Sequence, residues 1–503
     1  MSANLFDIIR TRIPATTKLL IETAAGAQIT YGDMLAQSAR LAHALRQRGV
    51  KPGDRIAVQV EKSPDNLILV LAALRAGAAY LPLNTAYTIA ELEYFIGDAE
   101  PALVVCDPTK REGLLPITQA HGAALDTLDA HGGGSLIGAA ATQPTDFADI
   151  ASGPNDLAAI LYTSGTTGRS KGAMLSHHNL SSNADVLADY WRFNTDDVLL
   201  HALPLYHTHG LFVASMTVML KGGTMLFLPK FDADEVIRLL PRATTMMGVP
   251  TFYTRLLQHP GFTRELTAHM RLFTSGSAPL LAETHREFSA RTGHAILERY
   301  GMTETGMNTS NPYDGDRIAG TVGFPLPGVD LRVVDAETGT PLEREAIGVI
   351  EVRGPNVFSG YWRMPEKTAA EFRPDGFFIT GDVGKIDSRG YVHIVGRAKD
   401  LIISGGFNVY PKEIESEIDD LPGVVESAVI GCPHPDFGEG VTAVVVKEGG
   451  ADVTEAAVIA ALERKLAKFK LPKRVLFVPE LPRNTMGKVQ KNVLRERNKR
   501  LFA

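Results

Sequence analysis

Residues 161–172 read Leu-Tyr-Thr-Ser-Gly-Thr-Thr-Gly-Arg-Ser-Lys-Gly. An apolar run at residues 157–161 leads into this stretch and predicts a buried strand. Behind it, apolar residues recur at helical spacing, at Leu180, Ala184, Leu187 and Trp191. Glycines let the backbone approach an anion closely, while hydroxyl and amide groups donate hydrogen bonds to it and Lys171 adds positive charge. We therefore predict a phosphate-binding loop between a strand and a helix.

This loop differs from a Walker loop, in which a glycine is followed five residues later by Gly-Lys-Ser or Gly-Lys-Thr. Counted from Gly165, that position is Ser170, and the glycine at Gly172 comes after the lysine. The alternative interpretation is a surface turn rich in serine, threonine and glycine. The strand before it, the helix after it and the lysine between them favour a binding loop.

The composition is that of a globular protein with a slight excess of acidic residues. The chain has 503 residues, a formal net charge of −6 and 45% hydrophobic residues, which is typical of soluble proteins and argues against disorder. The acidic balance makes nonspecific nucleic-acid binding a poor expectation. The two cysteines, Cys106 and Cys432, lie far apart, which argues against a zinc site and fits a reducing compartment.

No segment resembles a secretory signal or a membrane span. Residues 1–7 lack a basic region followed by an apolar core. The most apolar stretch, residues 66–83, contains Arg75, Gly77 and Pro82 and predicts a buried helix followed by a strand. We expect a cytoplasmic protein with neither a membrane nor a nucleic acid as partner.

Strand-like and helix-like segments alternate through most of the chain, which predicts sheets covered by helices. Strands are expected at residues 55–60 and 102–106, with a helix at 65–75. The last hundred residues show an α+β pattern instead. Helices are expected there at 412–421 and 453–468, and strands at 426–431 and 442–446. We predict a domain boundary near residue 399.

Five motifs in chain order resemble those of the adenylate-forming superfamily, which includes acyl-CoA synthetases, luciferases and nonribosomal adenylation domains. After the loop come Tyr-Gly-Met-Thr-Glu at 300–304, Thr-Gly-Asp at 380–382, Gly-Arg-Ala-Lys-Asp at 396–400 and Pro-Arg-Asn-Thr-Met-Gly-Lys at 482–488. The resemblance implies an α/β adenylate-forming fold. A large N-terminal AMP-binding domain of layered sheets and helices, residues 1–398, would work with a small mobile α+β domain, residues 399–503.

The resemblance also implies a site for ATP and Mg²⁺. Glu304 would bind magnesium, which prefers oxygen ligands, Asp382 would bind the ribose, and Arg397 would support the ribose or a phosphate. The expected nucleotide-binding residues are Thr163, Ser164, Gly165, Thr166, Thr167, Gly168, Lys171, Ser277, Ala278, Glu298, Arg299, Tyr300, Gly301, Met302, Thr303, Asp382 and Arg397. Tyr300 would offer its aromatic face to adenine.

Adenylation brings a carboxylate to the α-phosphorus of ATP, so two anions must approach each other and positive charge is required. Lys488 matches the superfamily's catalytic lysine, and His207 and Glu304 are the other expected catalytic residues. The resemblance places His207 near the acyl pocket. A metal site at His207 and His209 is the less favoured alternative, because no third ligand lies nearby in the sequence.

In the second half-reaction the thiol of coenzyme A attacks the acyl-adenylate. In this superfamily the C-terminal domain rotates about a hinge between the two steps. Lys399 occupies the hinge position, where many members have aspartate. After rotation Ser404, Gly405 and Gly406 would face the site and line the path of the thiol arm.

Two segments that would line the acid pocket carry an arginine. Arg255 lies four residues after Thr251 on the same helical face, and Arg299 precedes Tyr300. A pocket arginine suits a second carboxylate; the alternative is an arginine that keeps its guanidinium in water. The pattern is similar to that of malonyl-CoA synthetases. This implies that Arg255 binds the distal carboxylate of malonate, with Ser277, His207 and Arg299 close by and Arg286 as a further contributor.

The resemblance thus predicts an AMP-forming acid–thiol ligase that joins malonate to coenzyme A, with methylmalonate as a further candidate substrate. Three alternatives stay open: a synthetase for another short acid, an adenylation enzyme that loads a carrier protein, and a nucleotide-binding regulator. Acetylation of Lys488 would remove the charge that adenylation needs. Because related synthetases are controlled in this way, we expect an acetyltransferase and a deacetylase as possible partners.

Overall fold

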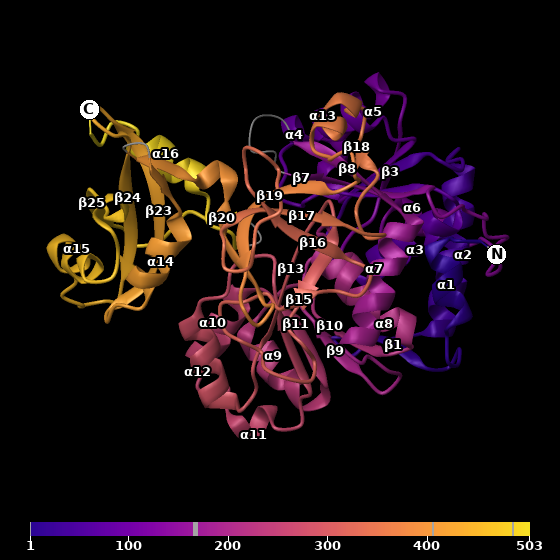
Figure 1. The fold of residues 1–503 in the computed structure, drawn as a ribbon. Helices are drawn as coiled ribbons and strands as arrows, with labels where there is room; N and C mark the ends of the chain where they lie inside the picture. Colours follow the sequence, from indigo (N-terminus) through magenta and orange to yellow (C-terminus); the bar gives the residue numbers. More distant parts are fainter. Residues whose placement is uncertain (1, 164–169, 405–406, 485–486, 503) are drawn as a thin grey trace.

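The computed structural model describes residues 2–163, 170–404, 407–484 and 487–502. These residues form three sheets in a large N-terminal part and a fourth in a small C-terminal part. In Figure 1 the small part, coloured orange to yellow, stands beside the large one and is joined to it near β20. The mixed α/β architecture with one large and one small unit confirms the predicted fold class.

The first sheet has a parallel centre and an antiparallel edge. Its strand order is β18-β8-β7-β4-β3-β5-β6. In this order the strands are Gly360–Tyr361, Lys171–Ser176, Leu157–Thr163, Ala79–Pro82, Arg55–Gln59, Leu103–Cys106 and Ala124–Thr127. The strands β7, β4, β3, β5 and β6 run parallel, whereas β8 and β18 pair antiparallel. The predicted strands at 55–60 and 102–106 are confirmed.

The segment after the phosphate loop corrects one expectation. The expected helix after the loop is present, but a strand that was not expected, β8, lies in between and pairs with β7 from Thr163 opposite Lys171 onward. The loop is therefore the connection of a β-hairpin. The helix follows one strand later as α7, His177–Tyr190. It begins there because the Ser176 side chain accepts a hydrogen bond from the Asn179 backbone amide and caps the helix.

The second sheet contributes the ends of several strands to one region. Its order is β15-β14-β13-β12-β11-β9-β10-β1-β2, with β13 to β1 parallel. In this order the strands are Phe324–Pro325, Gly306–Ser310, Leu297–Met302, Leu272–Ser275, Thr245–Gly248, Val198–His201, Thr224–Phe227, Leu19–Thr23 and Gln28–Thr30. The carboxyl ends of parallel strands are where α/β proteins place their ligands, so β11, β12 and β13 point to a site.

The other two sheets are mainly antiparallel. The third has the order β16-β17-β19-β20 and comprises Asp330–Val334, Gly348–Arg353, Phe378–Ile386 and Val392–Arg397. The fourth, in the C-terminal part, has the order β22-β21-β24-β23, with β25 parallel to β24. Its strands β21 to β25 are Ile402–Ser404, Phe407–Val409, Val424–His434, Gly438–Lys447 and Arg474–Phe477.

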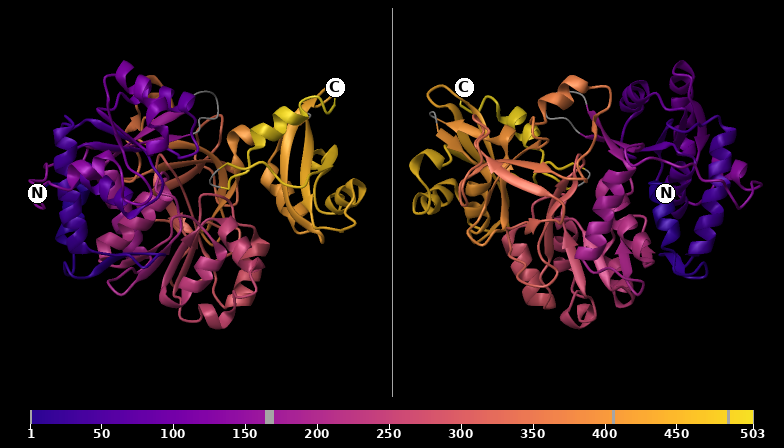
Figure 2. Two further views of the ribbon diagram at one scale, coloured as in Figure 1. Left: turned by 180° about the vertical axis from the view of Figure 1, so that it is seen from behind. Right: turned by 45° about the vertical axis from the view of Figure 1, so that its right-hand side comes forward.

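Helices cover the sheets of both parts, as the two views of Figure 2 show. In the N-terminal part, α1 to α6 are Leu5–Thr11, Tyr31–Gln47, Pro64–Arg75, Ile89–Ala99, Arg111–Ala120 and Ser135–Ala140. After α7, helices α8 to α13 are Met216–Lys221, Ala233–Leu239, Pro250–Gln258, Arg264–Thr267, Ala282–Thr292 and Pro365–Ala370. The C-terminal helices α14 to α16 are Pro411–Asp419, Glu455–Glu463 and Lys491–Asn498. The expected helix at 453–468 thus ends early, in a region that continues as a short 3₁₀ turn.

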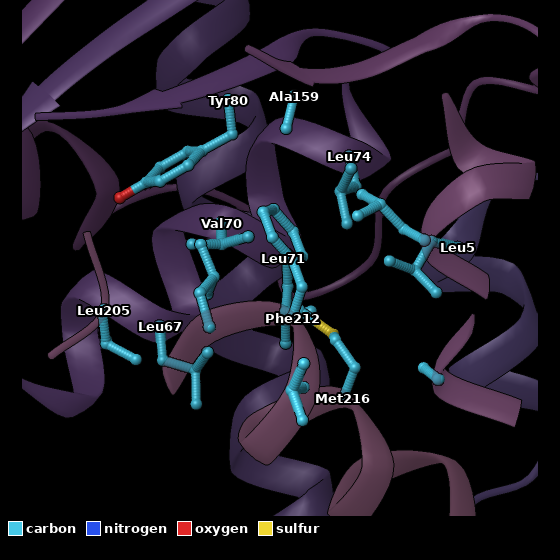
Figure 3. Close-up of a cluster of buried hydrophobic side chains, with 14 of the residues drawn as sticks. Leu5, Leu67, Val70, Leu71, Leu74, Tyr80, Ala159, Leu205, Phe212 and Met216 are labelled. Atoms are coloured by element: carbon cyan, nitrogen blue, oxygen red, sulfur yellow. The ribbon is translucent and has the colours of Figure 1, made fainter. Parts of the chain in front are cut away.

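The central core is built around α3, whose residues from Asn66 to Arg75 are all buried. Figure 3 shows Leu67, Val70 and Leu71 of this helix beside Phe212 and Met216. This confirms the predicted buried helix at 66–75, which is followed by the strand β4. Among the described residues, no helix combines the length and the apolar character that crossing a membrane requires.

Candidate active site

The third sheet brings the ribose-motif residues together. Asp382 on β19 lies opposite Arg397 on β20, and Arg397 Nε is 2.6 Å from Asp382 Oδ1. Tyr300 on β13 donates its hydroxyl hydrogen to Asp382 Oδ2 at 2.5 Å. Burial opposes charge on Arg397, but Asp382 outweighs it and raises the pKa of the guanidinium. Asp382, Arg397 and Tyr300 thus form a connected group in which the charges of Asp382 and Arg397 balance each other.

Lys488 of the C-terminal part lies near this group of residues. The lysine lies on a tight turn closed by Asn484 N donating to Lys488 O at 2.9 Å, with Gly487 at a φ of 76°. Although much of the residue's surface is exposed, desolvation of the ammonium group and the charge of Arg397 lower the pKa of Lys488 to about 8. Asp382 acts in the opposite direction. Lys488 is therefore within electrostatic range of the ribose-motif residues.

Glu304 lies at the turn between β13 and β14 and is buried. Tyr361 Oη is 3.0 Å from Glu304 Oε1, and burial raises the pKa of this carboxyl group. Among the described residues Glu304 has no ion pair. One buried carboxylate without a cationic partner fits Mg²⁺, which is held by one or two protein carboxylates together with substrate phosphates.

Arg299 is a buried arginine with no ion-pair partner among the described residues. Arg299 on β13 is 4% exposed, and among the described residues its Nε and Nη2 have no hydrogen-bond partner. Burial lowers the pKa of Arg299 to about 9. The guanidinium occupies space that Gly276 leaves open, since a Cβ at that position would lie 2.2 Å from Arg299 Nη1. This region of the N-terminal part therefore holds a positive charge without a negative partner among the described residues.

Two histidines adjoin this arginine. His207 Nδ1 accepts the backbone amide hydrogen of His209 at 3.2 Å, and His209 Nδ1 is 3.2 Å from Ser277 Oγ. Burial and then Arg299 lower the pKa of His207 to about 4, so its imidazole is neutral at pH 7. His209 starts a π-helical turn, His209–Ser215; from the sequence it was considered only as a ligand in the less favoured metal-site alternative. Ser277 has a φ of 70°, a strained value typical of functional sites.

Comparison with known proteins gives the family. The model for the AMP-binding enzyme family matches residues 12–362, and that for the AMP-binding enzyme C-terminal domain matches residues 413–488. The chain belongs to the AMP-binding enzyme family. It is an AMP-forming acid–thiol ligase, which confirms the expected enzyme class.

Several relatives of the AMP-binding family are similar over nearly the whole chain. Feruloyl-CoA synthase from Amycolatopsis sp is 37% identical over 94% of both chains. Malonate–CoA ligase from Arabidopsis thaliana is 35% identical over 89% of this chain and 78% of that protein. ATP-bound MatB from Rhodopseudomonas palustris is 66% identical over 100% of both chains, with a TM-score of 0.99; apo MatB gives 0.88. The fold therefore resembles the ATP-bound form of MatB more than its apo form.

The two other arginines that were expected near the acid, Arg255 and Arg286, are both exposed. Arg255 is exposed on α10, one turn beyond Thr251, which lies against Gly487, the neighbour of Lys488. Arg286 on α12 pairs with Asp420 of the C-terminal part at 3.2 Å, and both side chains are exposed. The structure thus brings Arg299, not Arg286, together with His207 and Ser277.

The remaining expected residues have mixed positions. Glu298 is buried, accepts the Gly320 amide hydrogen at 3.3 Å, and has its pKa raised to about 8 by burial. Thr163 ends β7, Gly301 and Met302 end β13, and Ala278 and Thr303 follow β12 and β13, all of them half-buried. Ser164, Gly165, Thr166, Thr167 and Gly168 lie outside the described residues, as do Gly405 and Gly406.

The hinge and thiol-arm residues lie at the start of the C-terminal part. Lys399 is in a 3₁₀ turn, Ala398–Asp400, and Asp400 pairs with Arg495 of α16. Ser404 is buried on the β21–β22 hairpin, opposite Phe407.

A cavity of about 220 Å³ in the N-terminal part is lined by Lys62, Val249, Phe252 and the segment 202–206 that leads into His207. In the described chain no cluster of three or more His, Cys, Asp or Glu side chains could hold a metal ion.

Proposed function

We propose that this enzyme is a malonyl-CoA synthetase. Malonate attacks the α-phosphorus of ATP and pyrophosphate leaves; the thiol of coenzyme A then attacks the acyl carbon of malonyl-adenylate and AMP leaves. The observation that carries the assignment is Arg299, a buried guanidinium with two nitrogens unpaired among the described residues. A dicarboxylic acid supplies the missing anion with the carboxylate that does not react.

The choice of acid follows from the cost of an unpaired buried charge. A carboxylate can bind two guanidinium nitrogens side by side. A monocarboxylic or aromatic acid would seal Arg299 into the pocket without a partner, which is strongly unfavourable. The names of the Arabidopsis ligase and the Amycolatopsis synthase point to different acids, and the charge of Arg299 favours malonate. Arg255, being exposed, would meet the acid only from the mouth of the pocket.

The residues of the chain have separate tasks in adenylation. Lys488 places positive charge between the two reacting anions, and Asp382 accepts hydrogen bonds from the ribose while Arg397 supports it. Because His207 Nδ1 accepts an amide hydrogen, its Nε2 carries the proton and donates a hydrogen bond toward the reacting oxygens. Mg²⁺ on Glu304 would neutralise the phosphates when bound.

The thiol step requires a different arrangement of the C-terminal part. Rotation about Lys399 would withdraw Lys488 and bring the hairpin of Ser404 to the site. The sulfur then forms a bond to the acyl carbon as the bond from that carbon to the AMP oxygen breaks, and the thiol proton passes to solvent. Support comes from the hairpin's position directly after the hinge turn.

An acid panel tests the assignment. Purified enzyme with ATP, Mg²⁺ and coenzyme A is given malonate, methylmalonate, acetate or ferulate, and pyrophosphate release and the thioester are measured. We expect malonyl-CoA to form, with acetate used at least about a hundredfold less efficiently because it leaves Arg299 unpaired. Equal use of acetate or ferulate would refute the malonate assignment. Adenylation without thioester formation would instead favour loading of a carrier protein.

Acetylation of Lys488 is proposed as a control of the adenylation step. Lys488 itself is exposed, so that a modifying enzyme can reach it, and acetylation removes its charge. We expect a protein acetyltransferase to modify Lys488 and abolish pyrophosphate release, and a deacetylase to restore it. Mass spectrometry showing full modification with full activity would contradict this role.

A further inference from the structure

A cluster of charged side chains surrounds Tyr361, next to the phosphate-loop lysine. Tyr361 is on the two-residue strand β18, which pairs with β8 beside Lys171. Its hydroxyl oxygen is 2.7 Å from Glu371 Oε2 and 3.0 Å from Glu304 Oε1. The phenol therefore connects the carboxyl group expected to bind magnesium with a second carboxylate, Glu371, to which no role has been given.

Glu371 also fixes the position of Lys171. Lys171 Nζ is 3.3 Å from Glu371 Oε1 and 4.0 Å from the centroid of the Tyr361 ring. The ammonium group is thus held by a carboxylate and by an aromatic face. The side chains of Lys171 and Glu371 are 19% and 20% exposed, so this contact is shielded more than an ordinary surface ion pair.

A second lysine binds the same carboxylate from outside. Lys367 Nζ is 2.7 Å from Glu371 Oε1, but its side chain is 45% exposed. Lys367 is one turn earlier in the same segment and contacts neither Tyr361 nor Glu304 in the described interactions. It offers a matched control, since its removal takes one cation from Glu371 and leaves Lys171 in place.

We propose that Glu371 is a positioning residue for nucleotide binding: it holds Lys171 directly and Glu304 through Tyr361, so that both groups face the phosphates together. This role rests on the proposed use of ATP. A carboxylate that only stabilised the end of α13 would need no contact with Lys171 or Tyr361. Glu371 reaches both, with one oxygen for each.

A double-mutant cycle on ATP affinity tests the proposal. Binding of ATP with Mg²⁺ is measured by calorimetry in the absence of any acid, for wild type, Glu371→Ala, Lys171→Met and the double variant. We expect Glu371→Ala to weaken binding about five- to tenfold, because a charge-assisted contact is lost. In the Lys171→Met background the same change should add less than about twofold, since residues that act through each other are not additive.

Three further measurements keep the outcome decisive. Glu371→Gln, which retains an acceptor for Lys171, should recover much of the affinity, and Lys367→Met should bind ATP like wild type. Additive losses, unchanged affinity or tighter binding in Glu371→Ala would overturn the positioning role. Thermal unfolding of each variant shows whether it is folded. Failure of malonate in the acid panel leaves this cycle intact, whereas a folded wild type that does not bind ATP refutes the nucleotide site and this role with it.

Discussion

Arg397 and Arg299 stand in opposite electrostatic situations at one site. Arg397 is paired with Asp382, which raises the pKa of its guanidinium. Arg299 is more deeply buried, and burial lowers its pKa to about 9. The protein supplies the counterion of the first arginine itself and leaves the second to be neutralised by a ligand. This difference supports the proposal that Arg299, and not Arg397, selects an anionic substrate.

The largest expected effect comes from removing the unpaired charge. In Arg299→Met, kcat/KM for malonate should fall by a factor corresponding to about 2–5 kcal/mol, because the distal carboxylate loses its buried partner. The motifs also include Arg299 among the expected nucleotide-binding residues, but our proposal assigns Arg299 to the acid and Arg397 to the nucleotide. The affinity for ATP, measured by calorimetry, should therefore stay within about twofold of wild type.

Arg255→Ala distinguishes between Arg255 and Arg299 as the main partner of the distal carboxylate. The sequence-based prediction is loss of malonate use in this variant, whereas the exposure of Arg255 gives it a smaller effect than Arg299→Met. Malonate kinetics that collapse in Arg255→Ala and persist in Arg299→Met would reverse the comparison.

The next largest effect is on the free energy of unfolding, which should rise when Arg299 is replaced and fall when Arg397 loses its counterion. Replacing Arg299 by Met removes an uncompensated buried charge and should raise the free energy of unfolding by about 1–3 kcal/mol. Asp382→Asn leaves Arg397 without its counterion and should lower it by about 1–2 kcal/mol, less than for a fully buried pair because Arg397 is 26% exposed. Urea unfolding of both variants at one pH measures the signs. Equal signs would show that the two arginines are electrostatically alike.

The smallest expected effect is a pH dependence of adenylation, set by Lys488 near the paired residues Arg397 and Asp382. Lys488 must be protonated to carry charge, and its pKa is lowered to about 8, so kcat/KM for ATP in adenylation should be level below pH 8 and fall above it. His207, with a pKa of about 4, should give no change between pH 5 and 7. Lys399 also lowers the pKa of Lys488, so Lys399→Met should move the fall to higher pH; a fall that stays in place would exclude Lys488 as its source.

The long elements were predictable from the sequence because their apolar patterns are strong. The buried helix that became α3 and the strands β3 and β5 lie where expected. The strand β8 was missed because residues 171–176 are a short apolar run directly after a loop, and only pairing with β7 makes them a strand. The helix α15 ends at Glu463. Leu466 and Phe469 beyond it still pack against the C-terminal core, so the apolar pattern continues past the end of the helix and does not show where it stops.

The site residues were predictable from the sequence where a motif identifies them. They were less predictable where a residue's role depends on whether its side chain is buried. Tyr300, Asp382 and Arg397 come together as the motifs imply. Arg299 received less weight than Arg255 because a sequence does not show whether an arginine keeps its guanidinium in water. The available signal was the period of β13, in which Leu297, Arg299 and Gly301 share one face. Glu371 lies outside the five motifs.

The open space at Gly276 also constrains how this enzyme can change by mutation. A side chain there would collide with the Arg299 guanidinium, so a substitution at position 276 forces that guanidinium to leave its buried position. Once Arg299 is replaced by a smaller residue, the same space becomes a void that a methyl group can fill. The two positions are therefore epistatic: a substitution at Gly276 displaces the guanidinium while Arg299 is present and fills a void once Arg299 has been replaced, and in the second case it makes reversion costly.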